Sequence, residues 1–287
     1  MVEIAENGVL KKTEKIKDLI SQYAKHNHVR LVHRGNAAIL CALYIAKKHN
    51  PKPFILVPDM GGWISFKKYP PLFHFEVRIV KTNRGIIDLI DLEKKADGGA
   101  ALILTSHAGY FAQQPLSYIS NICKKHNCLL IEDASPAVGD KELCNGDYSD
   151  IIVASFGEHK PVNNCYGGFI SVKNQEFFAD SSTIFSTTNF NPRNPEALLK
   201  KLADVPNRLD RFYALQEKVK TELEGLGFKI LHRDKKGLNV MVKPMTDEEK
   251  TRLLDYCKKK KFEFVQCPKY IRLEEDAISI ELKRLNI

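Results

Sequence analysis

The sequence has 287 residues, 44% of them hydrophobic and 28% charged, and a formal net charge of +9. This composition excludes a disordered chain, and the length fits one large domain or two modest ones. No apolar run reaches the ~18 residues that a membrane helix needs, and no basic segment followed by an apolar core opens the chain, so we expect a cytoplasmic protein that binds no membrane.

The first half of the sequence predicts helices that alternate with short buried strands. Residues 10–26 have apolar side chains at helical spacing, and residues 36–49 predict a mostly buried helix that begins just after Gly35. Helical segments then separate four strand-like apolar runs, at 54–57, 77–80, 101–105 and 128–133. This alternation predicts an α/β fold with a mainly parallel sheet between helices.

The pattern changes after two further strands, at 151–156 and 168–172. Turn residues near 185 lead into a long helix at about 195–224, in which we expect a break at Pro206. A helix at 246–260 lies among four predicted strands, near 228–231, 238–243, 262–266 and 277–282. We therefore expect three parts: an N-terminal helical segment (1–30), a large domain (31–190), and the long helix with a small α+β domain (191–287).

The cysteines and the basic residues argue against two classes of protein. Seven scattered cysteines without a C-x-x-C pair do not predict a disulfide scaffold or a metal site, so we expect reduced thiols and no metal. The basic residues occur mostly as pairs near helix ends, where cations complement the helix dipole, and only Lys258–Lys261 forms a block. The charge therefore favours solvated helix faces over a nucleic-acid surface.

Four features lie at strand ends of the large domain, where open parallel sheets bind ligands. Residues 35–38 (GNAA) open a helix, whose N-terminal N–H groups favour an anion. Glu132 and Asp133 close a buried strand, and such a carboxylate either caps the next turn or holds a cationic ligand atom. Lys160 follows the next strand, and the Gly167-Gly168 pair precedes another. Singly, each is better explained as a helix start, a strand cap, a solvated lysine or a tight turn.

In this order and spacing, the features resemble the DegT-type family of pyridoxal phosphate (PLP) enzymes. These are sugar aminotransferases of the aspartate aminotransferase fold, also called fold type I. GNAAILCAL is similar to the family's G-T-A-A-L-x-x-A-L phosphate loop, and LLIEDASPAVG to its V-I-E-D-A-A-Q-A-x-G strand and turn. SFGEHKPVNNCYGGFISV is similar to the family's S-F-x-x-x-K followed by a Gly-Gly strand. NFNPRNPEALLKKL is similar to its motif Y-N-Y-R-M-S-E-x-Q-A-A-x-G-x-x-Q-L. The resemblance covers residues 31–225 well and the rest loosely.

The resemblance implies PLP as the cofactor and gives roles to the residues that match these motifs. Lys160 would carry PLP as an internal aldimine, and Asp133 would pair with the pyridine nitrogen and keep it protonated. The phosphate would be held by the Ser155 hydroxyl and by the loop residues Gly35, Asn36 and Ala37. The family's Thr stands as Asn36 here, and the Gln that usually contacts the PLP hydroxyl is replaced by Pro136.

Four further residues follow from the same resemblance. Trp63, the only tryptophan, lies one position beyond the family's ring-stacking aromatic, and the alternative is a core tryptophan. His107 falls in the family's H-x-Y-G segment, where it could line the pocket or cap a strand end. Asn191 would reach the phosphate of the neighbouring subunit, because the family builds its site across a homodimer. Arg193 matches an arginine of the motif, and its role is left open.

The leading hypothesis for function is a PLP-dependent aminotransferase that acts on a small-molecule amino donor and a keto acceptor, by family analogy a keto-sugar. A PLP-dependent lyase or dehydratase is the second reading, since the pocket decides which bond breaks. Cysteine desulfuration through Cys165 is a variant of it. A PLP-fold protein that has lost catalysis and binds or regulates is the alternative from another class. The C-terminal domain is shorter than the family's, which leaves the substrate class open.

Overall fold

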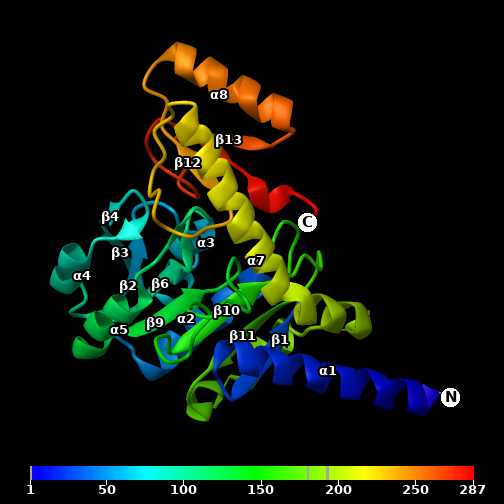
Figure 1. The fold of residues 1–287 in the computed structure, drawn as a ribbon. Helices are drawn as coiled ribbons and strands as arrows, with labels where there is room; N and C mark the ends of the chain where they lie inside the picture. The colour runs from blue at the N-terminus through cyan, green and yellow to red at the C-terminus, as the bar shows by residue number, and fades with distance from the viewer. Residues whose placement is uncertain (1, 180, 192–193) are drawn as a thin grey trace.

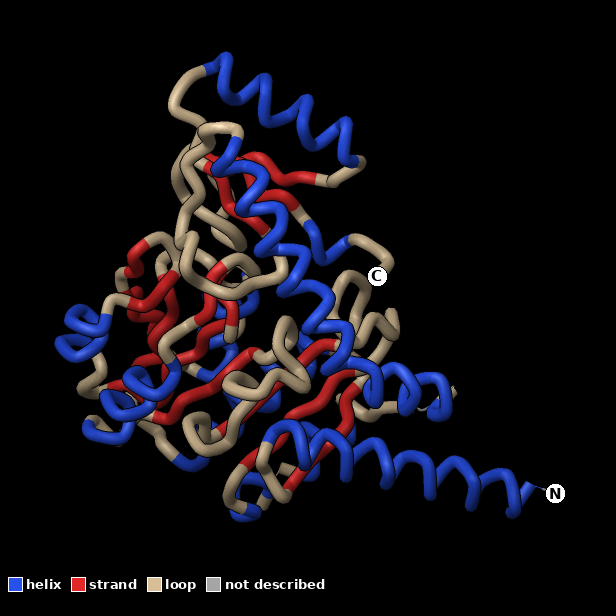
Figure 2. Tube along the Cα trace, viewed as in Figure 1, coloured by secondary structure: helices blue, strands red, loops and turns tan. Residues whose placement is uncertain are grey.

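The computed structural model describes residues 2–179, 181–191 and 194–287, and a seven-stranded sheet forms the centre of its larger part (Figures 1 and 2). In order across the sheet, the strands are β1 (His28–Val32), β11 (Gly168–Val172), β10 (Ile151–Ser155), β9 (Leu129–Asp133), β6 (Gly99–Thr105), β2 (Phe54–Pro58) and β3 (Glu76–Val80). β11 runs in the direction opposite to that of the other six strands. The predicted mainly parallel sheet between helices is thus confirmed.

Both faces of this sheet are covered, which explains why its strands are apolar without alternation. Side chains such as Ile151 and Val153 pack with α2 (Gly35–His49) on one face. Their neighbours Ile152 and Ala154 pack with α1 (Val2–Ala24) and α7 (Pro195–Gly225) on the other. That second face is extended by two more helices, α4 (Leu89–Lys95) and α5 (Leu116–Lys125).

Short elements connect this framework. Beside α2 lie α3 (Ile64–Lys68), α6 (Ser182–Thr187) and the 3₁₀ turns η1 (Pro70–Phe73) and η2 (Gln175–Phe178). Two small hairpins pair β4 (Thr82–Asn83) with β5 (Ile86–Ile87) and β7 (His107–Ala108) with β8 (Ala112–Gln113). The second hairpin follows β6 directly, at the end of the sheet where the strands' carboxyl ends meet.

Glu132 anchors the end of β9 from the inside of the protein. The side chain is fully buried, and its carboxylate accepts hydrogen bonds from the hydroxyls of Ser106 (2.6 Å) and Ser149 (2.7 Å) and from the backbone N–H groups of Cys144 (2.8 Å) and Asn145 (3.4 Å). Burial raises the pKa of Glu132, while these bonds act in the opposite direction. Glu132 is thus a structural cap, whereas the next residue, Asp133, lines a cavity at this end of the sheet.

The expected helix break at Pro206 is wrong. α7 is one helix of 31 residues with Pro206 inside it, and it changes direction within its olive-coloured first part (Figure 1). A proline removes one backbone hydrogen bond and kinks a helix, but burial of the flanking turns can hold the helix together. Leu202, Val205 and Leu209 supply that burial against the large domain, and Pro206 itself lies close to Gly139.

The C-terminal part contains a three-stranded antiparallel sheet, and α7 and α8 (Asp247–Lys260) both pack on one face of it. Its strands, in order, are β12 (Val240–Val242), β14 (Ala277–Ile280) and β13 (Phe264–Cys267), and the turn η3 (Leu282–Arg284) follows β14. The strand predicted near 228–231 is reduced to a single bridge between Ile230 and Val242. The loop from β13 to β14 returns to the large domain, where Gly61 N–H donates to Tyr270 O (2.7 Å).

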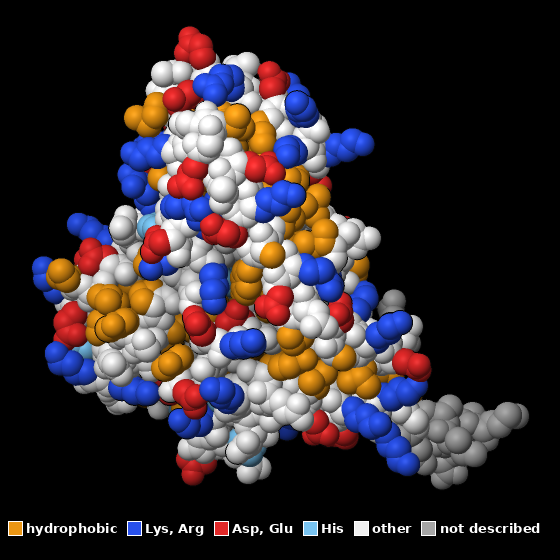
Figure 3. Space-filling view, in the orientation of Figure 1, with side chains coloured by type: hydrophobic (Ala, Val, Ile, Leu, Met, Phe, Trp, Pro, Cys, Tyr) orange, Lys and Arg blue, Asp and Glu red, His pale blue; other side chains and the backbone are white. Residues whose placement is uncertain are grey.

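The surface carries basic and acidic side chains in mixture, as Figure 3 illustrates for one face. Within the basic block, Lys258 pairs with Asp255 (3.3 Å) and Lys260 with Glu222 (2.7 Å). All seven cysteines are free thiols. Over the described ranges, none of the helices has the length and apolar character for a membrane crossing, and no group of three or more His, Cys, Asp or Glu side chains is arranged to hold a metal ion.

Candidate active site

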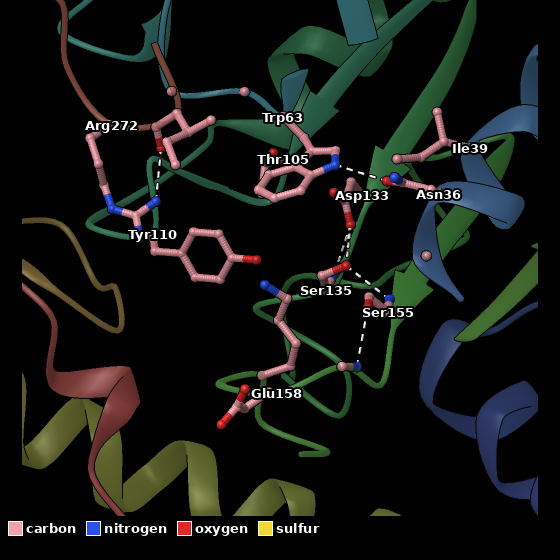
Figure 4. A pocket seen from close by; sticks show the side chains of 16 residues that line it. Asn36, Ile39, Trp63, Thr105, Tyr110, Asp133, Ser135, Ser155, Glu158 and Arg272 are labelled. Carbon is pink, nitrogen blue, oxygen red and sulfur yellow. Dashed lines mark hydrogen bonds between the residues drawn. The ribbon is translucent and has the colours of Figure 1, made fainter. Parts of the chain in front are cut away.

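A cavity of about 200 Å³ lies at the carboxyl ends of the central strands, beside the start of α2 (Figure 4). Its walls come from α2, from the loop after β2, from the ends of β6, β9 and β10 with the loops that follow them, and from the C-terminal loop. The predicted site residues among its lining are Gly35, Asn36, Trp63, Asp133, Ser155 and Lys160. These six come from segments up to 125 residues apart (35 to 160), so the fold itself brings them together.

One end of the cavity is suited to an anion. α2 begins at Gly35 after an Arg34 N-cap that makes no side-chain cap bond, so the helix supplies its own N-terminal N–H groups. Ser155 Oγ accepts a hydrogen bond from Gly157 N–H (3.1 Å), which leaves the hydroxyl proton to donate to a ligand. A Cβ on Gly35 would lie 2.6 Å from Ser155 Cβ, so only glycine allows the helix to approach so closely.

Asp133 forms another side of the cavity at the end of β9. Its Oδ1 accepts hydrogen bonds from Ser135 N–H (3.0 Å) and the Ser135 hydroxyl (2.5 Å), and Ser135 Oγ accepts one from Ser155 N–H (2.9 Å) (Figure 4). Burial raises the pKa of Asp133, whereas the Ser135 bonds and the charge of Lys160 oppose that rise. Since both bonds use Oδ1, Oδ2 is available to a cationic or N–H group of a ligand.

Lys160 projects from the loop after β10 toward two aromatic rings. Its Nζ lies 4.9 Å from the ring centroid of Tyr110 and 5.8 Å from that of Trp63. Trp63 is 36% exposed and lines the cavity, so it is not a core tryptophan. Its Nε1–H donates to Asn36 Oδ1 (2.8 Å), a bond that fixes the indole to the first turn of α2 (Figure 4).

Three other predicted residues do not line this cavity, and a fourth lies outside the part of the chain that the structure describes. Ala37 is buried in the first turn of α2. His107 is fully buried, with Nε2 3.5 Å from the Tyr213 hydroxyl, and burial lowers its pKa to about 4, so the ring is neutral near pH 7. Asn191 donates its backbone N–H to the Tyr166 hydroxyl (3.1 Å), outside the cavity. Arg193 lies outside the described residues.

Two prominent lining residues were missed from the sequence. Tyr110 lies three positions after His107 in the segment that follows β6, and its ring lines the cavity. Arg272 comes from the C-terminal loop, for which no local motif exists. It is held by a buried bidentate bond to Glu281 (2.8 and 2.6 Å) and lies with its Cζ 5.2 Å from the Tyr110 ring centroid.

Two family models match this chain. The model of the DegT/DnrJ/EryC1/StrS aminotransferase family matches residues 3–236, and that of the MJ1341 family C-terminal domain matches residues 206–287.

Similar solved structures share the fold at low sequence identity. A cysteine desulfurase from Thermococcus onnurineus NA1 has a TM-score of 0.74 at 13% identity, with 96% of this chain and 80% of that chain covered. Ureidoglycine-glyoxylate aminotransferase from Bacillus subtilis has a TM-score of 0.67 at 12% sequence identity, with 96% of this chain and 80% of that chain covered. A structure titled SPT with its PLP internal aldimine has a TM-score of 0.69 at 13% sequence identity, with 94% of this chain and 71% of that chain covered.

The Gly35→Ala substitution tests the anion-binding end of the cavity. The added methyl group would collide with Ser155 and displace the first turn of α2, and we expect the affinity for PLP to fall about tenfold or more, since charge-assisted hydrogen bonds contribute ~1.5–3 kcal/mol each. Equilibrium dialysis against PLP measures the change. Gly225→Ala is the matched control because no heavy atom lies within 4 Å of its added Cβ. Unchanged affinity in Gly35→Ala would contradict the assignment of this end.

Proposed function

The chain belongs to the DegT/DnrJ/EryC1/StrS aminotransferase family and is a PLP-dependent aminotransferase, and from this premise we propose how its own residues divide the work. The donor is a small amino compound, and the acceptor is a keto compound, for which family analogy suggests a keto-sugar. One observation carries the assignment: a lysine amine lies between two aromatic rings in a cavity with an anion-binding end and a buried carboxylate.

The residues present fit PLP in three respects. The glycine-lined cradle of Gly35 and the Ser155 hydroxyl suit a phosphate. Oδ2 of Asp133 suits a protonated pyridine nitrogen, because a cationic partner offsets the cost of burying the carboxylate. The indole of Trp63 offers a flat surface at the cavity, held by Asn36. PLP, when bound, supplies an electron sink for the charge left on a substrate carbon that loses a proton.

Lys160 has two proposed tasks. Its Nζ would hold the cofactor before the substrate arrives. The freed amine would then act as the base that takes the proton from the substrate Cα, and as the acid that gives this proton up again. The rings of Tyr110 and Trp63, at 4.9 and 5.8 Å from Nζ, are the aromatic neighbours of this amine in the cavity. Asp133 holds the proton on the pyridine nitrogen throughout, which keeps the ring able to accept charge.

The other readings have less support. Solved structures of the same fold include a cysteine desulfurase and an aminotransferase, so the fold alone does not select the reaction. Cys165 is exposed and lines a neighbouring hollow with Arg34 and Tyr166, while it is not among the residues around Lys160, so no observation favours desulfuration. The set of seven free thiols supports the cytoplasm as the compartment that we propose.

Borohydride reduction of the PLP-loaded protein, followed by peptide mapping, tests the proposed function. We expect the pyridoxyl group on Lys160, and the Lys160→Ala variant should bind PLP without retaining a label after reduction. The alternative acceptor in the neighbourhood is Lys283, whose Nζ lies 4.9 Å from the same Tyr110 ring. A label on Lys283 or on any other lysine would overturn the assignment of Lys160.

Asp133→Asn tests the pyridine partner. The amide cannot stabilise a positive charge on the ring nitrogen, so we expect PLP to bind while the rate of the half-reaction with an amino donor falls about a hundredfold, as for other lost proton-holding groups. Single-turnover spectra measure that rate. Glu158→Gln is the control, because Glu158 lines the cavity but is exposed. A wild-type rate in Asp133→Asn would remove the carboxylate from the mechanism.

We also propose a homodimer in which Asn191 serves the partner's site. A phosphate needs several donors, and Asn191 lies outside the cavity of its own chain. Mixing a Lys160→Ala protein with an Asn191→Ala protein tests this, since a mixed dimer then has one site with both defects and one intact site. We expect about a quarter of the wild-type activity to return on random reassortment of a two-fold dimer. If mixing restores no activity although mass spectrometry detects mixed dimers, Asn191 acts within its own chain or not at all.

A further inference from the structure

The loop that carries Lys160 has a strained backbone on both sides of this residue. It joins β10 to β11 (residues 156–167), and three of its residues other than glycine have φ angles in the left-handed region: His159 (59°), Asn163 (46°) and Cys165 (60°). A side chain makes this region unfavourable, because Cβ then lies close to the following carbonyl oxygen. Such a conformation persists only where the surrounding structure holds it in place.

The helix α7 holds this loop from outside the cavity. Arg208 donates a hydrogen bond from Nη1 to Pro161 O (3.0 Å), and Lys201 donates one from Nζ to Asn163 O (2.7 Å). In the described part of the chain, these two are the only side chains outside the loop that donate hydrogen bonds to its backbone. Val162 of the loop is also buried in the apolar cluster to which α7 contributes.

Arg208 acts on the residue directly after the lysine. The proline at position 161 fixes its own φ and limits the backbone angles that are open to Lys160. Because φ of Pro161 is fixed, a bond that holds the Pro161 carbonyl also limits where the backbone of Lys160 can lie. Lys160 lines the cavity and Arg208 does not, so the arginine can influence the amine only through the loop.

Packing alone does not account for an arginine at this place. Over the described ranges Arg208 forms no ion pair, and its Nε is buried without a hydrogen-bond partner. Asp204, one turn earlier, pairs with Arg211 instead (3.0 Å). Burial lowers the pKa of Arg208, and the charge of Arg211 adds to this effect. An apolar side chain would cover the neighbouring Phe212 ring at a lower cost, so the gain lies in the bond to the loop.

We propose that Arg208, supported by Lys201, is a positioning residue for Lys160. Its bond to the Pro161 carbonyl holds the loop so that the lysine amine meets the aldehyde carbon of PLP. This inference rests on the proposed function. The reaction at that place is a reversible condensation, in which the amine and the aldehyde form one C=N bond and release one water molecule. Proximity and orientation of the two groups determine how favourable that bond is.

A double-mutant cycle on PLP binding tests this role by equilibrium dialysis. Arg208→Met keeps an apolar stem over Phe212 and removes the donors, and we expect it to weaken PLP binding about tenfold, the size of one hydrogen bond to a charged group. In the Lys160→Ala background no C=N bond forms, so the same substitution should change the affinity by less than about twofold. Arg208→Lys should restore most of the affinity, since one donor serves Pro161. Arg211→Met is the matched control, because Arg211 lies on the same helix and pairs with Asp204.

Two results would overturn the inference. They are an unchanged PLP affinity in Arg208→Met, and an equal loss of affinity with and without Lys160, which would show that Arg208 only supports the cavity as a whole. If Arg208→Met does not fold, the same cycle with Lys201→Met decides, because Lys201 is exposed and a loss is again expected only where Lys160 is present. Borohydride labelling of the wild type separates the two proposals. A label on Lys160 together with either overturning result rejects only the positioning role, whereas a label elsewhere rejects the proposed function.

Discussion

The site depends on how closely the first turn of α2 approaches the end of β10. The missing Cβ of Gly35 lets the helix come within contact distance of Ser155, so N–H groups and a hydroxyl converge on one point. The same approach brings Asn36 to Trp63, and Ser135 connects Ser155 to Asp133. A displacement of α2 by less than the width of a methyl group would therefore disturb the anion cradle and the ring surface together.

The large domain could be predicted from the sequence because its signals are local. Strands buried on both faces appear as continuous apolar runs, and residues at strand ends share one edge of a parallel sheet, so Asp133, Ser155 and Lys160 could be placed at one cavity before any coordinates. The wrong prediction at Pro206 has a physical reason. The local rule describes the lost hydrogen bond, but not the burial of Leu202 and Leu209 that holds the helix.

The C-terminal wall of the cavity could not be predicted in this way. Arg272 reaches the cavity only because its loop docks on the large domain through the Gly61–Tyr270 backbone bond, a contact between residues 209 positions apart (61 to 270). Glu281, nine positions after Arg272, then holds the guanidinium in place. Enzymes that share a fold and a cofactor differ in reaction through the residues that surround the substrate. A cavity wall that comes from a C-terminal loop is one place where such differences arise.

The hydrogen bond between Trp63 and Asn36 has a practical consequence. Trp63 is the only tryptophan of the chain, and its indole is attached by Nε1 to the helix that forms the anion cradle. All tryptophan emission of the protein thus originates at the edge of one cavity, next to the lysine amine. The protein therefore carries an intrinsic fluorophore in the wall of this cavity, so that binding at this one site can be followed by tryptophan fluorescence without any added label.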